Sequence, residues 1–319
     1  MGDYLFVFDR THDAIAAERA LLEGGLSVGV MPVPAAIAAG CGIGLRVKPN
    51  QRAAAATLLR AQTIAAELYH IGGGYPLVEA KPVFSPALNL QQGDAVALVG
   101  CGGKTTLLHR LAAELRSETV LLATTTRILP PSEGLIDAVN PAYLSIGVNL
   151  LHGGMDGKKL TSLELAQLET LRPAEGYTLL ECDGSKGLPL KGWADYEPVL
   201  PAWTTVTVGI CTLRPVGEIF SAENVHRPAL FCRMTGAELG TPITLAHVAA
   251  MVSHEAGLFG KAAGQRFLFI NQVETEAQTA QAQKLVSILP QEFRGSLAGI
   301  LIGSVQQGIV TALDGRRSG

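Results

Sequence analysis

The sequence predicts an α/β protein with a mainly parallel sheet and helices on both faces, preceded by a small α+β unit. Three observations support this prediction. From about Val96 onward, short apolar strand candidates alternate with helix-prone stretches. A glycine-rich turn joins the first of these strands to a helix. Residues 1–71 contain their own strand and helix candidates, in the order β-α-β-β-α-β.

The order of elements in the first unit is typical of a ferredoxin-like sandwich. A strand is expected at Tyr4–Phe8, followed by a helix that Thr11 could cap and that runs to about Leu22. The remaining candidates are strands at Leu26–Met31, Gly42–Val47 and Leu68–Ile71 and an alanine-rich helix at Gln51–Ala66. Glycines and prolines between residues 72 and 86 interrupt regular structure. We therefore expect domains at residues 1–73 and 94–319, joined by a linker at residues 74–93.

The large domain is predicted from a series of buried strands separated by helices. After the strand that begins near Val96, further strands are expected at Val120–Ala123, Tyr177–Leu180, Thr205–Ile210, Phe267–Ile270 and Leu297–Ile302. Such alternation requires crossover connections, which produce a mainly parallel sheet covered by helices.

The first of these strands leads into a motif that predicts phosphate binding. An apolar run from Ala95 is followed by Gly100, Cys101, Gly102, Gly103, Lys104, Thr105 and Thr106, and then by a helix-prone segment. Glycines allow backbone N–H groups to surround an anion, and a helix N-terminus adds partial positive charge. Lys104 would contact the outer phosphates, and the Thr105 hydroxyl would be a Mg²⁺ ligand. This layout is P-loop NTPase-like, although its spacing is two residues shorter than the Walker pattern and resembles the loop of Mur-type ATP-dependent ligases.

A second strand ends in two carboxylates. Glu181 and Asp183 follow the strand candidate that starts at Tyr177. Residues two apart on a strand point to the same face, so both side chains would lie on one side of the sheet. There they could bind Mg²⁺ or orient a water molecule. We therefore assign Glu181 and Asp183, with Lys104, as candidate catalytic residues, and read Cys182 as a core cysteine.

Two more strand ends carry polar side chains. Thr126 and Arg127 follow the strand that ends near Ala123, where α/β proteins bind ligands, and could contact phosphate or substrate. Asn271 begins the segment Asn271-Gln-Val-Glu274, at the place where GTPase-like proteins carry Asn-Lys-x-Asp to read guanine. The substitution of glutamate for aspartate leaves both ATP and GTP open as the nucleotide. His226, beside Arg227, is a further candidate for substrate contact.

Composition excludes several other classes of function. The net charge of −3 and the absence of a basic run interleaved with aromatics argue against nucleic-acid binding. No apolar segment reaches the ~20 residues that cross a bilayer, and no signal peptide is evident, so we expect no membrane association. The cysteines are odd in number and lack C-x-x-C spacing: Cys41, Cys101, Cys182, Cys211 and Cys232. We therefore expect neither disulfides nor a structural zinc site, and a cytoplasmic location.

Cys41 lies in a loop of small residues between two strand candidates. Glycines on both sides leave its sulfur uncrowded, and Arg46 is close in sequence. Such surroundings can lower the pKa of a thiol and favour the nucleophilic thiolate. The alternative is a buried cysteine that fills a small space, which is how most free cysteines behave.

Four separated motifs in the large domain resemble the YqeC-type accessory proteins of selenium-dependent molybdenum hydroxylases. The motifs are Val99–Thr106, Thr124–Arg127, Glu181–Lys191 and Val225–Pro228. The first domain is similar to the small selenium/sulfur carrier domain through Pro32-x-Pro34 and the segment Gly40–Leu45. This second resemblance favours Cys41 as a persulfide or selenopersulfide carrier.

The resemblance implies an accessory protein for maturation of a selenium-dependent molybdenum hydroxylase. Its partners would be that enzyme or its cofactor-insertion machinery and a sulfur or selenium donor protein. With the phosphate motif, we expect a nucleotide-hydrolysing protein that uses ATP or GTP with Mg²⁺. Two alternatives remain open: an ATP-dependent ligase or kinase, as in the Mur-type comparison, and a non-hydrolysing chaperone that bound nucleotide switches between conformations.

Overall fold

The computed structural model describes residues 2–37, 42–72 and 74–313. The chain forms two compact units. The first consists of Met1–Pro82 with Pro131–Asp137, and the second of Val83–Pro130 with Ala138–Gly319. The expected linker at residues 74–93 contains regular structure, because β5 (Leu77–Glu79) and α3 (Phe84–Ala87) lie within it.

The first unit has a five-stranded antiparallel sheet in the order β2-β3-β1-β4-β5. Its other elements are β1 (Tyr4–Val7), α1 (Thr11–Glu23), β2 (Gly29–Pro32), β3 (Ile43–Val47), the 3₁₀ turn Pro49–Gln51, α2 (Arg52–Ala61) and β4 (Glu67–His70). The expected succession β-α-β-β-α-β is therefore present, and β5 adds an edge strand. The core of this unit lies between the helices and the sheet, with Phe6, Ala17, Leu45 and Leu59 among its buried side chains.

Two boundaries in the first unit differ from the sequence-based expectation. Arg10 occupies the N-cap of α1 and makes no side-chain cap bond, so Thr11 is the first helical residue and not the cap. α2 ends at Ala61, five residues earlier than expected. The chain leaves the helix because Thr63 adopts a left-handed conformation with φ 57°.

The second unit is built on a nine-stranded sheet in the order β19-β18-β17-β15-β6-β13-β7-β10-β9. All neighbouring strands are parallel except the terminal pair β18–β19. The strands are β6 (Ala95–Gly100), β7 (Thr119–Thr124), β9 (Ala138–Val139), β10 (Gly147–Leu150), β13 (Tyr177–Glu181), β15 (Val206–Thr212), β17 (Gln265–Asn271), β18 (Gly299–Ser304) and β19 (Ile309–Ala312). The mainly parallel sheet is confirmed, and β9, β10 and β19 are strands that the sequence did not predict.

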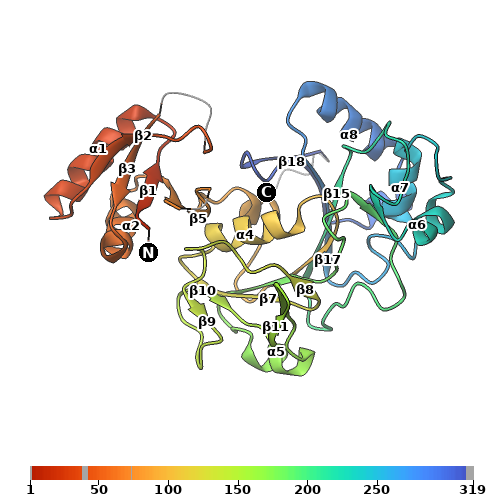
Figure 1. Ribbon diagram of the computed structural model, residues 1–319, viewed down its shortest axis with the longest axis horizontal. Helices are drawn as coiled ribbons and strands as arrows, with labels where there is room; N and C mark the ends of the chain where they lie inside the picture. Colours follow the sequence, from red (N-terminus) through yellow and green to blue (C-terminus); the bar gives the residue numbers. More distant parts are fainter. Residues whose placement is uncertain (1, 38–41, 73, 314–319) are drawn as a thin grey trace. The chain divides into compact units, whose positions relative to one another are not determined.

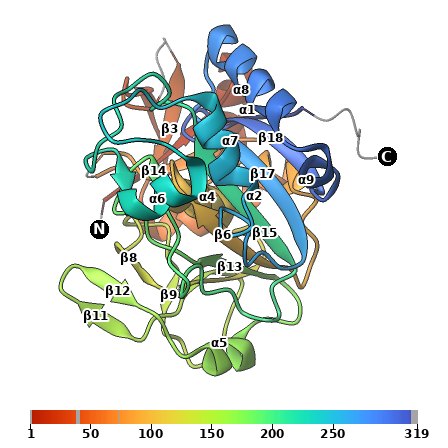
Figure 2. The same ribbon diagram turned by 90° about the vertical axis from the view of Figure 1, so that its right-hand side faces the viewer.

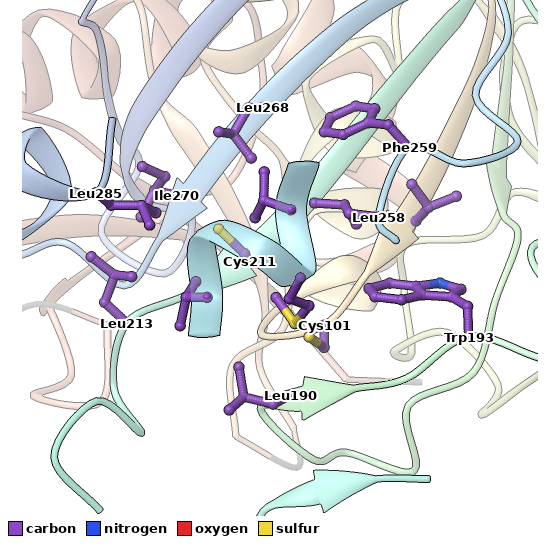
Figure 3. Packing of buried hydrophobic residues seen from close by; sticks show 14 of the residues in the cluster. Cys101, Leu190, Trp193, Cys211, Leu213, Leu258, Phe259, Leu268, Ile270 and Leu285 are labelled. Atoms are coloured by element: carbon purple, nitrogen blue, oxygen red, sulfur yellow. The ribbon is translucent and has the colours of Figure 1, made fainter. Parts of the chain in front are cut away.

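Helices cover both faces of this sheet. The helices are α4 (Lys104–Glu114), α5 (Leu165–Leu171), α6 (Pro228–Thr235), α7 (Leu245–Ser253), α8 (Glu276–Ile288) and α9 (Gln291–Gly295). Figures 1 and 2 show α4 on one face and α6, α7 and α8 on the other. A large apolar core lies beneath the second group, where Cys101, Cys211, Leu258 and Leu268 pack together (Figure 3). The central strands are buried on both faces, which explains their continuous apolar sequences.

Two small sheets extend the carboxyl ends of the central strands. β8 (Arg127–Ile128) follows β7 and joins β11 (Gly154–Asp156) and β12 (Lys159–Thr161) in the order β11-β12-β8. β14 (Leu190–Lys191) follows β13 and pairs with β16 (Val225–His226). These additions place polar segments near the ends of β7 and β13.

Among the described residues, no helix is both long and apolar enough to cross a membrane.

Candidate functional site

The glycine-rich loop lies where the order of strands reverses. β6, which precedes the loop, is hydrogen-bonded to β15 on one side and β13 on the other, and neither is its neighbour in sequence. In open α/β sheets, ligands bind at the carboxyl ends of strands at such a reversal. The loop then leads directly into α4, whose first residue is Lys104.

Three glycines of the loop adopt conformations that other residues rarely reach. Gly100, Gly102 and Gly103 have φ angles of 105°, 85° and 132°. A Cβ atom on Gly100 would lie 2.1 Å from the backbone oxygen of Ile210, so the neighbouring strand also excludes a side chain there.

Cys101 anchors the loop in the core. Its N–H donates to the oxygen of Ile210 at 3.0 Å, and its side chain is buried. Burial raises the pKa of its thiol to about 12. Cys101 therefore contributes its backbone to the loop, and its sulfur is unsuited to act as a nucleophile.

The ammonium group of Lys104 is buried against a carboxylate. Only 4% of the residue is exposed, and Nζ donates to the oxygen of Gly100 at 2.5 Å and lies 3.2 Å from Oδ1 of Asp183. Burial alone would lower the pKa of Lys104, but attraction to Asp183 and Glu181 outweighs it, so the pKa is raised. Lys104 is thus positively charged and held at the loop, and an incoming phosphate would have to compete with Asp183 for it.

Asp183 is fully buried and accepts hydrogen bonds from several donors. Both of its carboxylate oxygens lie 3.1 Å from the backbone nitrogen of Gly100. Oδ2 also accepts from Nζ of Lys191 at 3.0 Å and from Nε1 of Trp193 at 2.8 Å. With Lys104, four groups therefore surround this carboxylate, and a metal ion could bind it only by displacing one of them.

Glu181 and Thr105 form the second polar pair of the site. The Thr105 hydroxyl donates to Oε2 of Glu181 at 2.7 Å. Glu181 is largely buried, and this burial raises the pKa of its carboxyl group. A hydroxyl and a carboxylate are oxygen ligands of the kind that Mg²⁺ accepts together with phosphate and water. The described residues contain no cluster of three or more His, Cys, Asp or Glu side chains suited to a metal, so such an ion would depend on the phosphate for its remaining ligands.

A row of alternating charges leads away from Asp183. Lys191 is completely buried and donates to Asp183, to the oxygen of Gly184 at 2.6 Å and to Oε2 of Glu197 at 2.9 Å. Glu197 accepts a further bond of 2.7 Å from Nη1 of Arg227. Burial opposes ionisation of Glu197, but its bonds to Arg227 and Lys191 prevail and lower its pKa to about 2.

Thr124, the last residue of β7, and Thr126 form hydrogen bonds at the end of the strand. Thr124 donates to the backbone oxygen of Glu181 at 2.9 Å and accepts from the N–H of Thr126 at 3.0 Å. Arg127 is exposed and forms an ion pair with Asp156 of β11. The predicted phosphate contact of Arg127 therefore stays a prediction that would require this exposed pair to open.

Asn271 is bonded to the glycine-rich loop itself. Its Nδ2 donates to the backbone oxygen of Gly102 at 2.7 Å, and its Oδ1 accepts from the N–H of Val305 at 3.1 Å. Glu274, the other candidate for base recognition, accepts a bond of 2.9 Å from Ser304. In this arrangement the amide of Asn271 joins the loop to Val305, the residue that follows β18, and its role in contacting a base stays a prediction.

The structure thus brings together Lys104, Thr105, Glu181, Asp183 and Asn271 around one loop. Gly100–Gly103 form that loop, Thr106 is exposed on the first turn of α4, and Thr126 lies at the next strand end. Cys41 lies outside the described residues. Trp193 and Glu197, which contact Asp183 and Lys191, were missed because they lie in an irregular segment whose sequence has no recognisable spacing.

His226 lies on β16 beside the row of charges. Burial and the neighbouring cations Arg227, Lys191 and Lys186 lower its pKa, so its imidazole favours the neutral form.

A separate cavity of about 370 Å³ is lined by residues of α8, α9 and β18, and none of the loop residues borders it.

The fold and this site define the class of protein. It is an α/β protein with a glycine-rich loop at the strand reversal of a mainly parallel sheet, fused to a small antiparallel α+β unit. The YqeC protein family matches residues 96–229, and the Se/S carrier protein-like family matches residues 3–70. The expected resemblance is confirmed: residues 96–229 resemble the YqeC family, and residues 3–70 resemble the Se/S carrier-like family.

A curated relative supports the same assignment. The chain is 29% identical over 228 residues to the uncharacterized protein YqeC of Escherichia coli (strain K12). The matched region covers 66% of this chain and 88% of that protein. No solved structure matches the chain.

Proposed function

We propose that this chain is a cytoplasmic accessory protein that binds and hydrolyses a nucleoside triphosphate during maturation of a selenium-dependent molybdenum hydroxylase. The YqeC-type region and the Se/S carrier-like domain support the selenium-related role. The nucleotide is ATP or GTP, and its triphosphate occupies the loop Gly100–Thr106. The molybdenum enzyme, or the machinery that inserts its cofactor, is the partner.

One observation carries the nucleotide proposal. A glycine loop at the strand reversal holds a charged lysine, and a Thr–Glu pair lies beside that lysine. The backbone N–H groups of the loop and the ammonium of Lys104 are suited to the phosphate oxygens.

Thr105 and Glu181 are the residues that would hold Mg²⁺. They offer oxygen ligands 2.7 Å apart, while Asp183 already accepts from four groups. When bound, the metal ion would neutralise charge on the phosphate oxygens. Glu181 would also hold the attacking water, and Lys104 would stabilise the charge that develops on the transferred phosphate.

Phosphate release by the wild type and by Lys104→Ala tests this proposal. We expect hydrolysis of ATP or GTP without an acceptor, and its loss in the variant, because the loop then lacks its side-chain cation for the outer phosphates. Lys284→Ala, an exposed position on α8, is the control for the change in net charge. Calorimetry with ATP, GTP and CTP shows whether binding survives. Equal rates in all three proteins, or no binding of any nucleotide by the wild type, would overturn the proposal.

We further propose that Cys41 carries sulfur or selenium. Its thiolate would attack the outer sulfur of a cysteine persulfide on the donor protein. A new S–S bond forms at Cys41, and the donor cysteine leaves as a thiolate. Mass spectrometry after incubation with a cysteine desulfurase and cysteine should show one added sulfur on the wild type and none on Cys41→Ser. The same adduct on both proteins would exclude the carrier role.

A further inference from the structure

Two buried lysines, Lys104 and Lys191, contact the carboxylate of Asp183. Lys104 must move from Asp183 to the phosphate when a triphosphate binds. That movement removes one cation from a carboxylate that is fully buried. A buried carboxylate without a cation is strongly unfavourable, so a second charge is needed to keep the exchange possible.

Lys191 has the geometry of that second charge. Its Nζ lies 3.0 Å from Oδ2 of Asp183, while Lys104 lies 3.2 Å from Oδ1. The two lysines therefore use different oxygens of one carboxylate. Lys191 is also held by the oxygen of Gly184 and by Glu197, and its Nζ lies 5.2 Å from the centre of the Trp193 ring.

These contacts fix Lys191 and leave Lys104 as the exchangeable cation. Lys191 is completely buried and bonded to three acceptors from three residues. Lys104 stands at the first position of α4 and contacts the loop carbonyl of Gly100. Glu197 also forms an ion pair with Arg227, so its negative charge does not depend on Lys191 alone.

We infer that Lys191 is a positioning residue for triphosphate binding: it is the permanent counter-ion of Asp183 that frees Lys104 for the phosphate. This inference rests on the proposed function. Without Lys191, Asp183 would retain Lys104 as its remaining cation, and the phosphate would have to break that pair. Lys191 itself does not touch the phosphate in this scheme.

The test uses the full chain as wild type and three variants. Calorimetry with MgATP and MgGTP is carried out on the wild type, Lys191→Met, Lys284→Met and the double variant Asp183→Asn/Lys191→Met, with thermal melting as the check of folding. We expect Lys191→Met to bind at least tenfold more weakly and Lys284→Met to bind as the wild type does. The double variant should regain affinity to within threefold of the wild type, because the neutral amide at position 183 no longer retains Lys104.

The outcomes separate this inference from the proposed function. A wild type that binds neither nucleotide overturns both. A wild type that binds, with Lys191→Met within twofold of it, overturns the inference alone. An equally weak double variant shows a merely structural role for Lys191 and also overturns the inference. Should Lys191→Met fail to fold, the double variant decides: affinity within threefold of the wild type supports the inference, and any weaker binding overturns it.

Discussion

At the scale of single residues, Gly100 shows how closely the loop fits its neighbours. Its φ of 105° is strained for any residue with a side chain, and a Cβ atom would lie 2.1 Å from the backbone of β15. β15 cannot move away from Gly100 without breaking its pairing with β6, in which Ile210 lies opposite Gly100. The loop therefore depends on glycine at this position both for conformation and for space.

We predict that Gly100→Ala lowers the free energy of unfolding by about 2 kcal/mol or more, because backbone strain of this kind alone costs about 1–3 kcal/mol. Urea unfolding measures the effect. Gly184→Ala is the matched control in the nearby loop, since a Cβ atom there meets nothing within 4 Å. Equal stability of the two variants would contradict the argument from close packing.

Some residue positions could be predicted from sequence, and others could not. The two-residue spacing of Glu181 and Asp183 was sufficient to predict that Cys182 lies in the core, where it is fully buried. The number of donors around Asp183 was not predictable. Trp193 and Glu197 reach Asp183 and Lys191 from an irregular segment, whose path depends on tertiary contacts and not on local periodicity.

At the scale of elements, long apolar segments were predicted best. β6, β15 and β17 are buried along most of their length and are continuous in hydrophobicity, so their sequences identify them. β9 has two residues and β19 is mostly exposed, so neither leaves a clear pattern. The nine-stranded order itself depends on which crossovers are made, which no single segment encodes.

The segment Lys191–Glu197 contributes to stability in a way that depends on pH. The pKa of Glu197 is lowered to about 2, below its ordinary value of 4.5. Between these values the unfolded chain binds the proton and the folded chain does not, so stability rises with pH. The stabilisation by Glu197 is therefore complete above pH 4.5 and is lost as the pH falls towards 2.

We predict that Glu197→Gln lowers the Tm at about pH 6 and that the difference from wild type shrinks by about pH 3. Thermal unfolding at both values tests this, with the exposed Glu223→Gln as a control for charge. A difference in Tm between Glu197→Gln and the wild type that grows as the pH falls would contradict the predicted direction of the pH dependence.

At the scale of the whole molecule, the chain has two units that each bury their own core. The core of the first unit includes Leu21, Leu45 and Leu68, and the core of the second surrounds Cys101 and Leu268. The change in element order and the glycine-rich break near residue 72 predict a boundary at residues 74–93, and these domain limits stay a prediction. The assignment of Pro131–Asp137 to the first unit could not be predicted, because that segment has neither a strand pattern nor a distinctive composition.

We predict that calorimetry resolves two unfolding transitions and that MgATP or MgGTP shifts only the one that belongs to the second unit. A ligand stabilises the unit that binds it by about 2.7 kcal/mol at a concentration of 100 Kd. For a unit of this size, that corresponds to a rise in Tm of about 5–10 °C. Lys104→Ala should abolish the shift and leave the other transition unchanged. The first unit has a separate core and lacks the glycine loop. An equal shift of both transitions would therefore contradict independent unfolding of the two units. A shift only in the transition of the first unit would show that the nucleotide binds that unit, and would contradict the prediction.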